Sequence, residues 1–259
     1  MLPTFNIFGF EIATYGLIIF IGIFIGSVVA VKYFRKFYDI NSEDLIFCIL
    51  YTVIGVGLGA KLLYFITNIP FLIENYDNID IWANITEMFK GGFVFYGGLI
   101  GGVLGILVYS KQFKISFKKL LLILIPIVPL IHAIGRIGCL CAGCCYGMKY
   151  SGFGSIVFHN SPIAPNNIPL FPMQIIESIC NFCIFIVLTL TYKKYVGTYK
   201  TLGLYCILYS IVRFILEFFR GDLLRGVFIL STSQWISIII FIIGIAIFIH
   251  EKKKTKSKI

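Results

Sequence analysis

The chain has 259 residues, of which 59% are hydrophobic and only 13% are charged, and its mean hydropathy is +0.94. Soluble domains are about a quarter charged, so this composition excludes an ordinary soluble fold, which could not bury so much apolar surface. The formal net charge of +10 would suggest a nucleic-acid partner in a soluble protein. Because the basic residues here lie between long apolar runs, we expect a lipid bilayer as partner and no nucleic acid.

The apolar runs predict an all-α polytopic integral membrane protein. A bilayer core about 30 Å thick requires about 20 apolar residues per spanning helix, and the chain repeatedly supplies runs of that length. We predict a single membrane-embedded domain over residues 1–259, with Pro126 and Pro129 breaking or kinking the fourth span. The seven predicted spans are 10–33, 45–67, 91–110, 120–140, 174–192, 201–219 and 233–250.

The basic residues predict the orientation of these spans. Four clusters lie at alternate ends of successive spans, at residues 32–36, 111–119, 193–200 and 252–258. Since cytoplasmic loops are enriched in lysine and arginine, we place all four clusters and the basic tail 251–259 in the cytoplasm, and the N-terminus outside. The outer connections 68–90 and 141–173 are then longer than the inner turns, which predicts a site that faces the outer leaflet.

Several ionisable residues fall within the predicted spans. Each costs about 3 kcal/mol or more at mid-membrane, so we expect these side chains to face the bundle interior and to have partners. They are Lys61, His132, Arg136, Glu177, Arg213 and Glu217.

Two of these residues, Arg136 and Arg213, are candidates for binding an anion. Arg213 and Glu217 are four residues apart and share a helical face, and this spacing is compatible with an internal ion pair or with a substrate role for Arg213. Arg220, one turn further, is expected to extend this face to the outer surface. Arg136 has no acidic residue within one turn, and an unpaired interior arginine in a membrane indicates a lipid phosphate as its partner.

Five segments resemble the motifs of prolipoprotein diacylglyceryl transferases, in the order of that family. The segment at 135–147 resembles the family signature in which Gly-Arg-apolar-Gly opens a re-entrant segment. The segment at 91–102 resembles the glycine-rich third helix of the family. The segments are GRIGCLCAGCCYG at 135–147, GGFVFYGGLIGG at 91–102, TYG at 14–16, FPMQIIE at 171–177 and RFILEFFR at 213–220.

This resemblance implies an enzyme of lipoprotein biosynthesis in the bacterial cytoplasmic membrane. Such enzymes carry the diacylglyceryl group of phosphatidylglycerol to the lipobox cysteine of a prolipoprotein, without a metal or diffusible cofactor. Arg136 and Arg213 would hold the phosphoglycerol head group and stabilise the leaving phosphate, with Glu217 orienting Arg213. The resemblance assigns the remaining substrate contacts to Tyr15, Gly97, Gly98, Gly138, Gly143, Gln174, Glu177, Glu217 and Arg220.

The chain departs from the family at the positions linked to proton handling. Tyr96 replaces a histidine found in many members, and a phenol is a poor general base at neutral pH. His132, one turn before Arg136, is a candidate substitute. In the signature, Cys139 and Cys144 replace an asparagine and a glutamate. If Arg136 lowers its pKa, Cys144 becomes a candidate nucleophile.

The cysteines leave a second function open. Four of the eight lie in CLCAGCC at 139–145, and they are compatible with small buried apolar residues, with disulfide or redox chemistry, or with a soft-metal site. The spacing is not that of a standard zinc or iron–sulfur site, so we predict no metal. The alternative function is a thiol-redox or metal-handling membrane protein on the same scaffold, or transfer of the lipid to a different acceptor.

Overall fold

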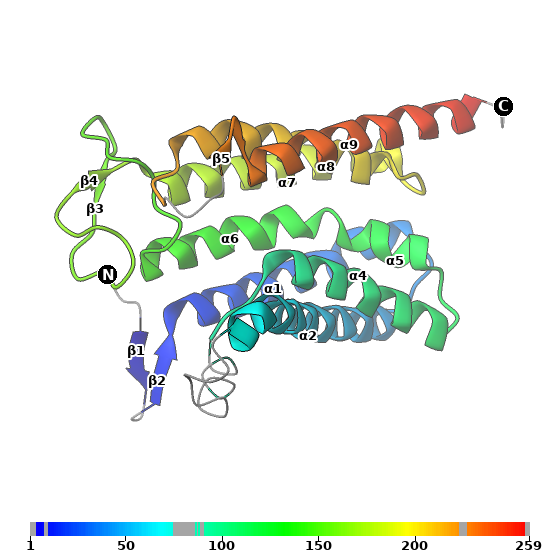
Figure 1. Ribbon diagram of the computed structural model, residues 1–259. Helices are drawn as coiled ribbons and strands as arrows, with labels where there is room; N and C mark the ends of the chain where they lie inside the picture. Colours follow the sequence, from blue (N-terminus) through cyan, green and yellow to red (C-terminus); the bar gives the residue numbers. More distant parts are fainter. Residues whose placement is uncertain are drawn as a thin grey trace. The chain divides into compact units, whose positions relative to one another are not determined.

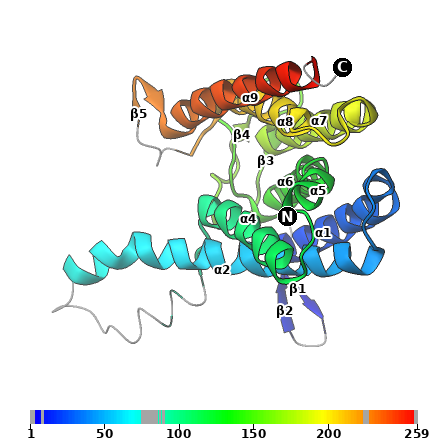
Figure 2. The same ribbon diagram turned by 90° about the vertical axis from the view of Figure 1, so that its right-hand side faces the viewer.

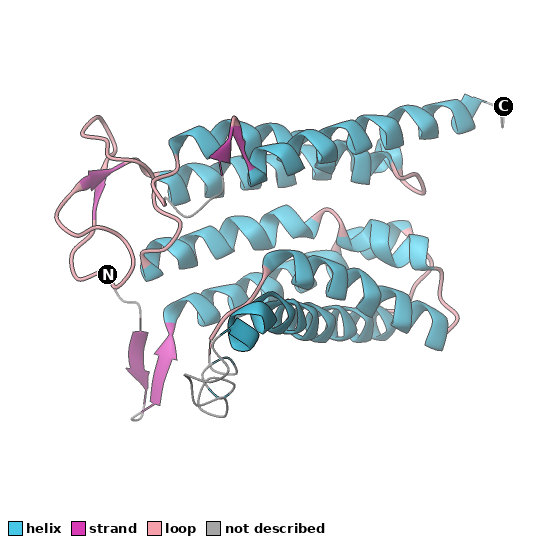
Figure 3. Cartoon of the chain, viewed as in Figure 1, coloured by secondary structure: helices cyan, strands magenta, loops and turns pink. Residues whose placement is uncertain are grey.

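The computed structural model describes residues 4–7, 10–74, 86, 88, 91–222 and 227–256 (Figure 1). Most of these residues are helical, and three small two-stranded hairpins accompany the helices (Figure 3). The predicted all-α polytopic class is confirmed. Much of the predicted outer connection 68–90 lies outside the described residues.

The helices follow the predicted spans in order, and the three hairpins are all antiparallel. The helices are α1 (Thr14–Lys32), α2 (Ser42–Glu74), α4 (Phe95–Gln112), α5 (Phe117–Leu124), α6 (Ile127–Ala142), α7 (Met173–Tyr195), α8 (Lys200–Leu216) and α9 (Thr232–Lys256), with 3₁₀ turns at Phe34–Phe37 and Glu217–Phe219. The strands are β1 (Thr4–Ile7), β2 (Phe10–Ala13), β3 (Ile156–Val157), β4 (Pro169–Leu170), β5 (Val227–Phe228) and β6 (Leu230–Ser231).

Among the described residues, five helices are long and apolar enough to cross a membrane, or six if α5 and α6 form one bent span. These five are α1, α2, α7, α8 and α9. α4 matches the third predicted span, but its glycines and its polar last turn lower its hydropathy. The number of seven spans and their orientation therefore stay predictions.

Four predicted span ends differ from the helix ends by four residues or more, one of them at α4, which begins at Phe95 rather than residue 91. The first helix begins at Thr14 rather than residue 10, because β2 occupies the preceding residues. α2 continues past Pro70 to Glu74, and α9 continues into the basic tail as far as Lys256. The break at Pro126 is confirmed, since α5 and α6 are bent by 40° at this point.

The chain forms two compact units, residues 1–37 with 122–259, and residues 38–121. In the first unit, α1 packs on α6, α6 on α7, α7 on α8 and α8 on α9 (Figures 1 and 2). This order brings three helices that carry ionisable side chains, α6, α7 and α8, next to one another.

In the second unit, α2 packs closely on α4. A Cβ atom added to Gly97 would meet the carbonyl oxygen of Gly59, and one added to Gly101 would meet that of Gly55. The two backbones therefore touch without side chains between them. Close helix packing explains these intramembrane glycines.

The predicted outer loop region is anchored to the end of α8. Phe158, Ala164 and Leu170 form its small buried core around the β3–β4 hairpin. The Met148 N–H donates to the Phe219 carbonyl at 2.8 Å, and the Phe171 and Phe219 rings stack at 4.9 Å. The segment that follows α6 is thereby held against the segment that follows α8.

Candidate active site

A buried cluster of charges lies where α6, α7 and α8 meet. The Glu177 carboxylate on α7 is 2.8 Å from the Arg136 guanidinium on α6 and 3.8 Å from the Arg213 guanidinium on α8. The Glu177 side chain is 2% exposed, and the two arginine side chains are 14% and 12% exposed. The structure thus places both predicted phosphate-binding arginines beside one carboxylate.

The expectation that Arg136 is unpaired is wrong. It rested on the absence of an acidic residue within one turn, whereas the partner, Glu177, comes from the next helix. Neither carboxylate oxygen of Glu177 makes an aligned hydrogen bond within the described part of the chain. Charge rather than a well-directed hydrogen bond therefore holds the Arg136–Glu177 pair.

The second ion pair is the one that the sequence predicted. An Arg213 Nη2 lies 2.7 Å from Glu217 Oε2, at the i, i+4 spacing. The same nitrogen donates to Ser233 Oγ at 3.2 Å, and Ser231 Oγ donates to Glu217 Oε1 at 3.0 Å. Sequence reasoning missed both serines, because nothing in the spacing of α8 indicates that the start of α9 folds back onto Arg213.

His132 orients Arg136. Arg136 Nε donates to His132 Nε2 at 3.2 Å, so this ring nitrogen is an acceptor and the imidazole is neutral. Two arginines and two glutamates then leave the cluster formally uncharged. The Nε2 lone pair is engaged by Arg136, and the role of His132 as a general base stays a prediction.

Each arginine keeps one poorly satisfied donor. Arg213 Nη1 is buried and has no hydrogen bond among the residues that the structure describes. Within the described ranges, Arg136 Nη1 donates to the sulfur of Cys139, at 3.8 Å, and to no oxygen. Because a buried donor without a good acceptor costs about 1–3 kcal/mol, both groups favour an anion that offers oxygen acceptors.

The end of α6 is shaped by Gly143. Its φ of 71° is left-handed, and its N–H and that of Cys144 donate to the carbonyls of Leu140 at 3.3 Å and Cys139 at 3.1 Å. This is the Schellman arrangement that commonly ends a helix. Gln174 Nε2 donates to the Cys144 carbonyl at 2.8 Å, so Gln174 and Gly143 both fix the turn after α6, and their contacts with substrate stay predictions.

Tyr15 lies against the same helix. A Cβ atom on Gly138 would lie 3.2 Å from Cδ2 of the Tyr15 ring, so the glycine makes room for the tyrosine. The Tyr15 side chain is 40% exposed, which leaves part of the ring accessible beside α6.

Arg220 does not extend the face of Arg213 as predicted. α8 ends at Leu216, a 3₁₀ turn follows, and Arg220 is extended. Its guanidinium makes a bidentate pair with Asp222, at 2.8 and 2.5 Å, and its side chain is 3% exposed. It is therefore a buried residue of the loop junction rather than an outward continuation of α8.

The remaining predicted residues belong to the second unit. Gly97 and Gly98 lie on the face of α4 that packs on α2, which gives them a packing role. Tyr96 is 42% exposed on α4, and its role in proton transfer stays a prediction. Lys61 donates to the backbone carbonyls of Met88 at 2.7 Å and of Gly91, and it therefore has the internal partners expected of an intramembrane lysine.

The cysteine that has the lower pKa is Cys145, not Cys144. The pKa of Cys145 lies well below its usual value because the neighbouring Cys139 and Cys144 thiols stabilise its thiolate, and the positive charge of Arg136 adds to this effect. For Cys144 the neighbouring Cys139 lowers the pKa, but Cys145 and burial outweigh it and raise the pKa to about 11. Arg136 does lower the pKa of Cys144, but its effect is smaller than those of Cys145 and burial, and the role of Cys144 as nucleophile stays a prediction.

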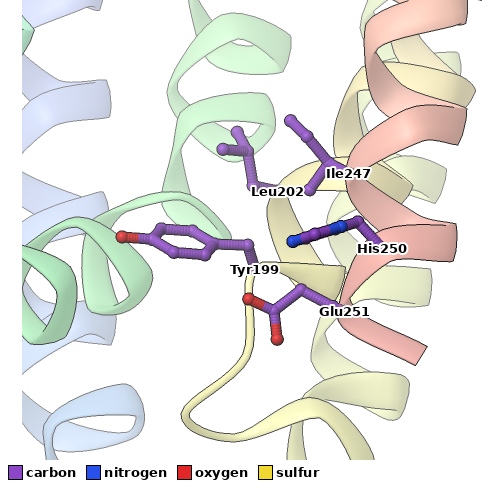
Figure 4. Close-up of a pocket in the computed structure, with 5 residues that line it drawn as sticks. All are labelled: Tyr199, Leu202, Ile247, His250 and Glu251. Atoms are coloured by element: carbon purple, nitrogen blue, oxygen red, sulfur yellow. The ribbon is translucent and has the colours of Figure 1, made fainter. Parts of the chain in front are cut away.

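A pocket at the other end of α8 is separate from the charge cluster. It is lined by Tyr199, Leu202, Ile247, His250 and Glu251, from the start of α8 and the end of α9 (Figure 4). A helical rise of 1.5 Å per residue places Leu202 about 16 Å from Arg213 along α8. None of the predicted site residues lines this pocket.

Comparison with known proteins gives the same family as the sequence motifs. The sequence profile described as prolipoprotein diacylglyceryl transferase matches residues 3–250. The chain belongs to the prolipoprotein diacylglyceryl transferase family. This match spans α6, α7 and α8, so the charge cluster lies entirely within the region shared with other prolipoprotein diacylglyceryl transferases.

Curated relatives cover almost the whole chain. The phosphatidylglycerol–prolipoprotein diacylglyceryl transferase of Clostridium tetani is 38% identical over 94% of this chain and 95% of its own length. Phosphatidylglycerol–prolipoprotein diacylglyceryl transferase 2 of Clostridium perfringens is 37% identical over 98% of this chain and 96% of its own length. The corresponding transferase of Finegoldia magna is 31% identical over 96% of this chain and 95% of its own length. The chain therefore matches these transferases from end to end rather than over one shared segment.

Proposed function

We propose that this protein transfers the diacylglyceryl group of phosphatidylglycerol to a cysteine thiol of a prolipoprotein, as a multi-pass enzyme of the bacterial cytoplasmic membrane. Relatives named for this reaction and matched along their full length support the assignment. They favour it over the thiol-redox alternative. The structural observation that carries it is the pair of buried arginines, Arg136 and Arg213, aimed at one point beside Glu177.

The phosphate of the lipid is the ligand that these arginines fit. Arg136 Nη1 and Arg213 Nη1 both lack a good oxygen acceptor, and guanidinium groups bind phosphate oxygens with fixed charge and matching geometry. The resting cluster is formally neutral, so a phosphodiester adds a single negative charge. Because Glu177 is held without aligned hydrogen bonds, its carboxylate can shift as phosphate oxygens bind.

The same arginines assist bond cleavage. The acceptor sulfur forms a bond to the glycerol carbon of the diacylglyceryl group, and the bond from that carbon to the phosphate oxygen breaks. The phosphate leaves as glycerol phosphate with one more negative charge, and the thiol proton passes to a base or to the leaving group. Donors already aimed at this developing charge lower the barrier, typically by a factor of about 10²–10³ per group.

The outer-leaflet side is the proposed side of entry. The candidate site lies at the end of α6 that leads into the long 141–173 region, and the basic clusters of the sequence lie toward the opposite helix ends. A lipobox segment of the prolipoprotein would present its cysteine from this side. Tyr15, which is partly exposed on α1, is suited to contact the substrate there.

The test is a transfer assay with purified protein in phosphatidylglycerol–detergent micelles. A lipobox peptide is added, and both the glycerol phosphate released and the mass of the peptide are measured. Release is expected to require the peptide and to fall at least 100-fold in Arg136→Ala. It is expected to persist in the matched control Arg35→Ala, which alters an arginine in the 3₁₀ turn that follows α1. The end of α1 before this turn is about 25 Å from Tyr15. Release that is independent of the peptide or of Arg136 would contradict the proposal.

A further inference from the structure

Three thiols converge beside the arginine cluster. The Sγ atoms of Cys139, Cys144 and Cys145 all lie within 4.8 Å of one another. The turn at Gly143 reverses the chain after α6, and Cys145 adopts a left-handed φ of 56°, which non-glycine residues rarely adopt. The backbone is thus folded so that two consecutive cysteines return over the thiol of the last helical turn.

Two arginines lie beside these thiols. Cys139 is buried and Cys144 and Cys145 are partly buried, and because burial disfavours a negative charge, a thiolate there needs a nearby positive group. Arg136 Nη1 lies 3.8 Å from Cys139 Sγ, and the charges of Arg136 and Arg220 both stabilise a thiolate at Cys145. Three sulfurs that lie within 4.8 Å of one another, two of them partly accessible, are placed to bind a cation that prefers sulfur ligands.

We propose that Cys139, Cys144 and Cys145 form a three-thiolate site for a soft d¹⁰ metal ion, Zn²⁺ or Cu⁺. Thiolates are the ligands that these ions prefer. With metal–sulfur bonds of about 2.3 Å, the sulfurs of a tetrahedral site are about 3.8 Å apart, so the present separations need to shrink by no more than about 1 Å. Zn²⁺ would hold water as its fourth ligand, and Cu⁺ is satisfied by three sulfurs.

Charge and protons balance at this site. Each thiol that becomes a ligand loses its proton to water, so binding releases up to three protons for each ion. Three thiolates and Zn²⁺ carry a net charge of −1, and with Cu⁺ the net charge is −2. Arg136 and Arg220 lie close enough to stabilise this negative charge, although each of them also pairs with a carboxylate, Glu177 and Asp222 respectively. None of the three proposed metal ligands is a residue to which we assign phosphate binding. The metal site is therefore independent of the transfer reaction.

Metal binding to the full-length protein tests the site. Purified protein in detergent is reduced, stripped with a chelator and titrated with Cd²⁺, a zinc surrogate whose thiolate complexes absorb in the ultraviolet. We expect one Cd²⁺ per chain and at least tenfold weaker binding in each of Cys139→Ser, Cys144→Ser and Cys145→Ser. The matched control is Cys180→Ser with Cys183→Ser, a thiol pair on α7 outside the cluster, and it is expected to bind like the unaltered protein.

Thermal unfolding of the variants establishes that they are folded. Displacement of Cd²⁺ by Zn²⁺, or retention of Cu⁺ against a copper(I) chelator, then identifies the ion. No thiolate band in the reduced protein would overturn the proposal, as would an undiminished band when all three cysteines are serine. Neither result would affect the transfer assay, so failure of the metal site and failure of the proposed function are distinguishable.

Discussion

Replacing Glu177 with glutamine removes the charge that the two arginines share. The amide keeps the size of the carboxylate, so little packing is lost, but Arg136 loses its ion pair and Arg213 keeps only Glu217. Breaking a buried pair by neutralising one partner costs about 3–5 kcal/mol. These side chains are 2–14% exposed, so solvent screens the interaction little, and we expect Glu177→Gln to lower the free energy of unfolding by about 3 kcal/mol.

The assay is unfolding of the purified protein in detergent, followed by circular dichroism. A loss of about 3 kcal/mol corresponds to a more than 100-fold change in the unfolding equilibrium. Glu43→Gln, an exposed acidic residue in the first turn of α2, is the matched control, and its effect is expected to be less than about 1 kcal/mol. If Glu177→Gln unfolds like this control, the carboxylate does not hold the two arginines, and the account of the cluster is wrong.

Three further predictions concern the same region. Arg213→Ala is expected to reduce lipid transfer at least 100-fold, since a donor to the leaving phosphate is lost, and a near-normal rate in the micelle assay would contradict this. Gly143→Ala is expected to lower stability by about 1 kcal/mol in thermal unfolding because of the left-handed φ, and an unchanged midpoint would exclude strain there. The pKa of Cys145 is lowered, so its thiolate persists at pH values below the usual thiol pKa. Alkylation of Cys145 by iodoacetamide at pH 6 is therefore expected to be faster than alkylation of Cys183. Equal alkylation rates, measured by mass spectrometry, would refute the lowered pKa.

Much of the fold followed from the sequence, because the bilayer imposes a length and a composition on each helix. The pair Arg213–Glu217 also followed, since its partners lie on one turn of one helix. The pairing of Arg136 with Glu177 did not, because it depends on which helices are neighbours. For the same reason Ser231 and Ser233, which hold the other carboxylate and arginine, carried no signal in the sequence.

Local backbone geometry accounts for the other differences. Arg220 was expected to continue the helical face of Arg213, but a 3₁₀ turn after Leu216 rotates the chain. The cysteine spacing resembled no standard metal motif, whereas a left-handed Cys145 brings three of the thiols together. Packing against the rest of the fold determines where one or a few residues depart from helical geometry. The helical periodicity of the sequence does not predict these departures.

The burial of the charge cluster separates it from the surrounding electrolyte. At physiological ionic strength, counter-ions largely screen exposed charges that are more than about 8 Å apart. Such ions have little access to side chains that are 2–14% exposed. The attraction of Arg136 and Arg213 for the proposed phosphate ligand is therefore expected to depend little on the ionic strength around the protein. Affinity for the lipid would then stay nearly constant between dilute and saline media.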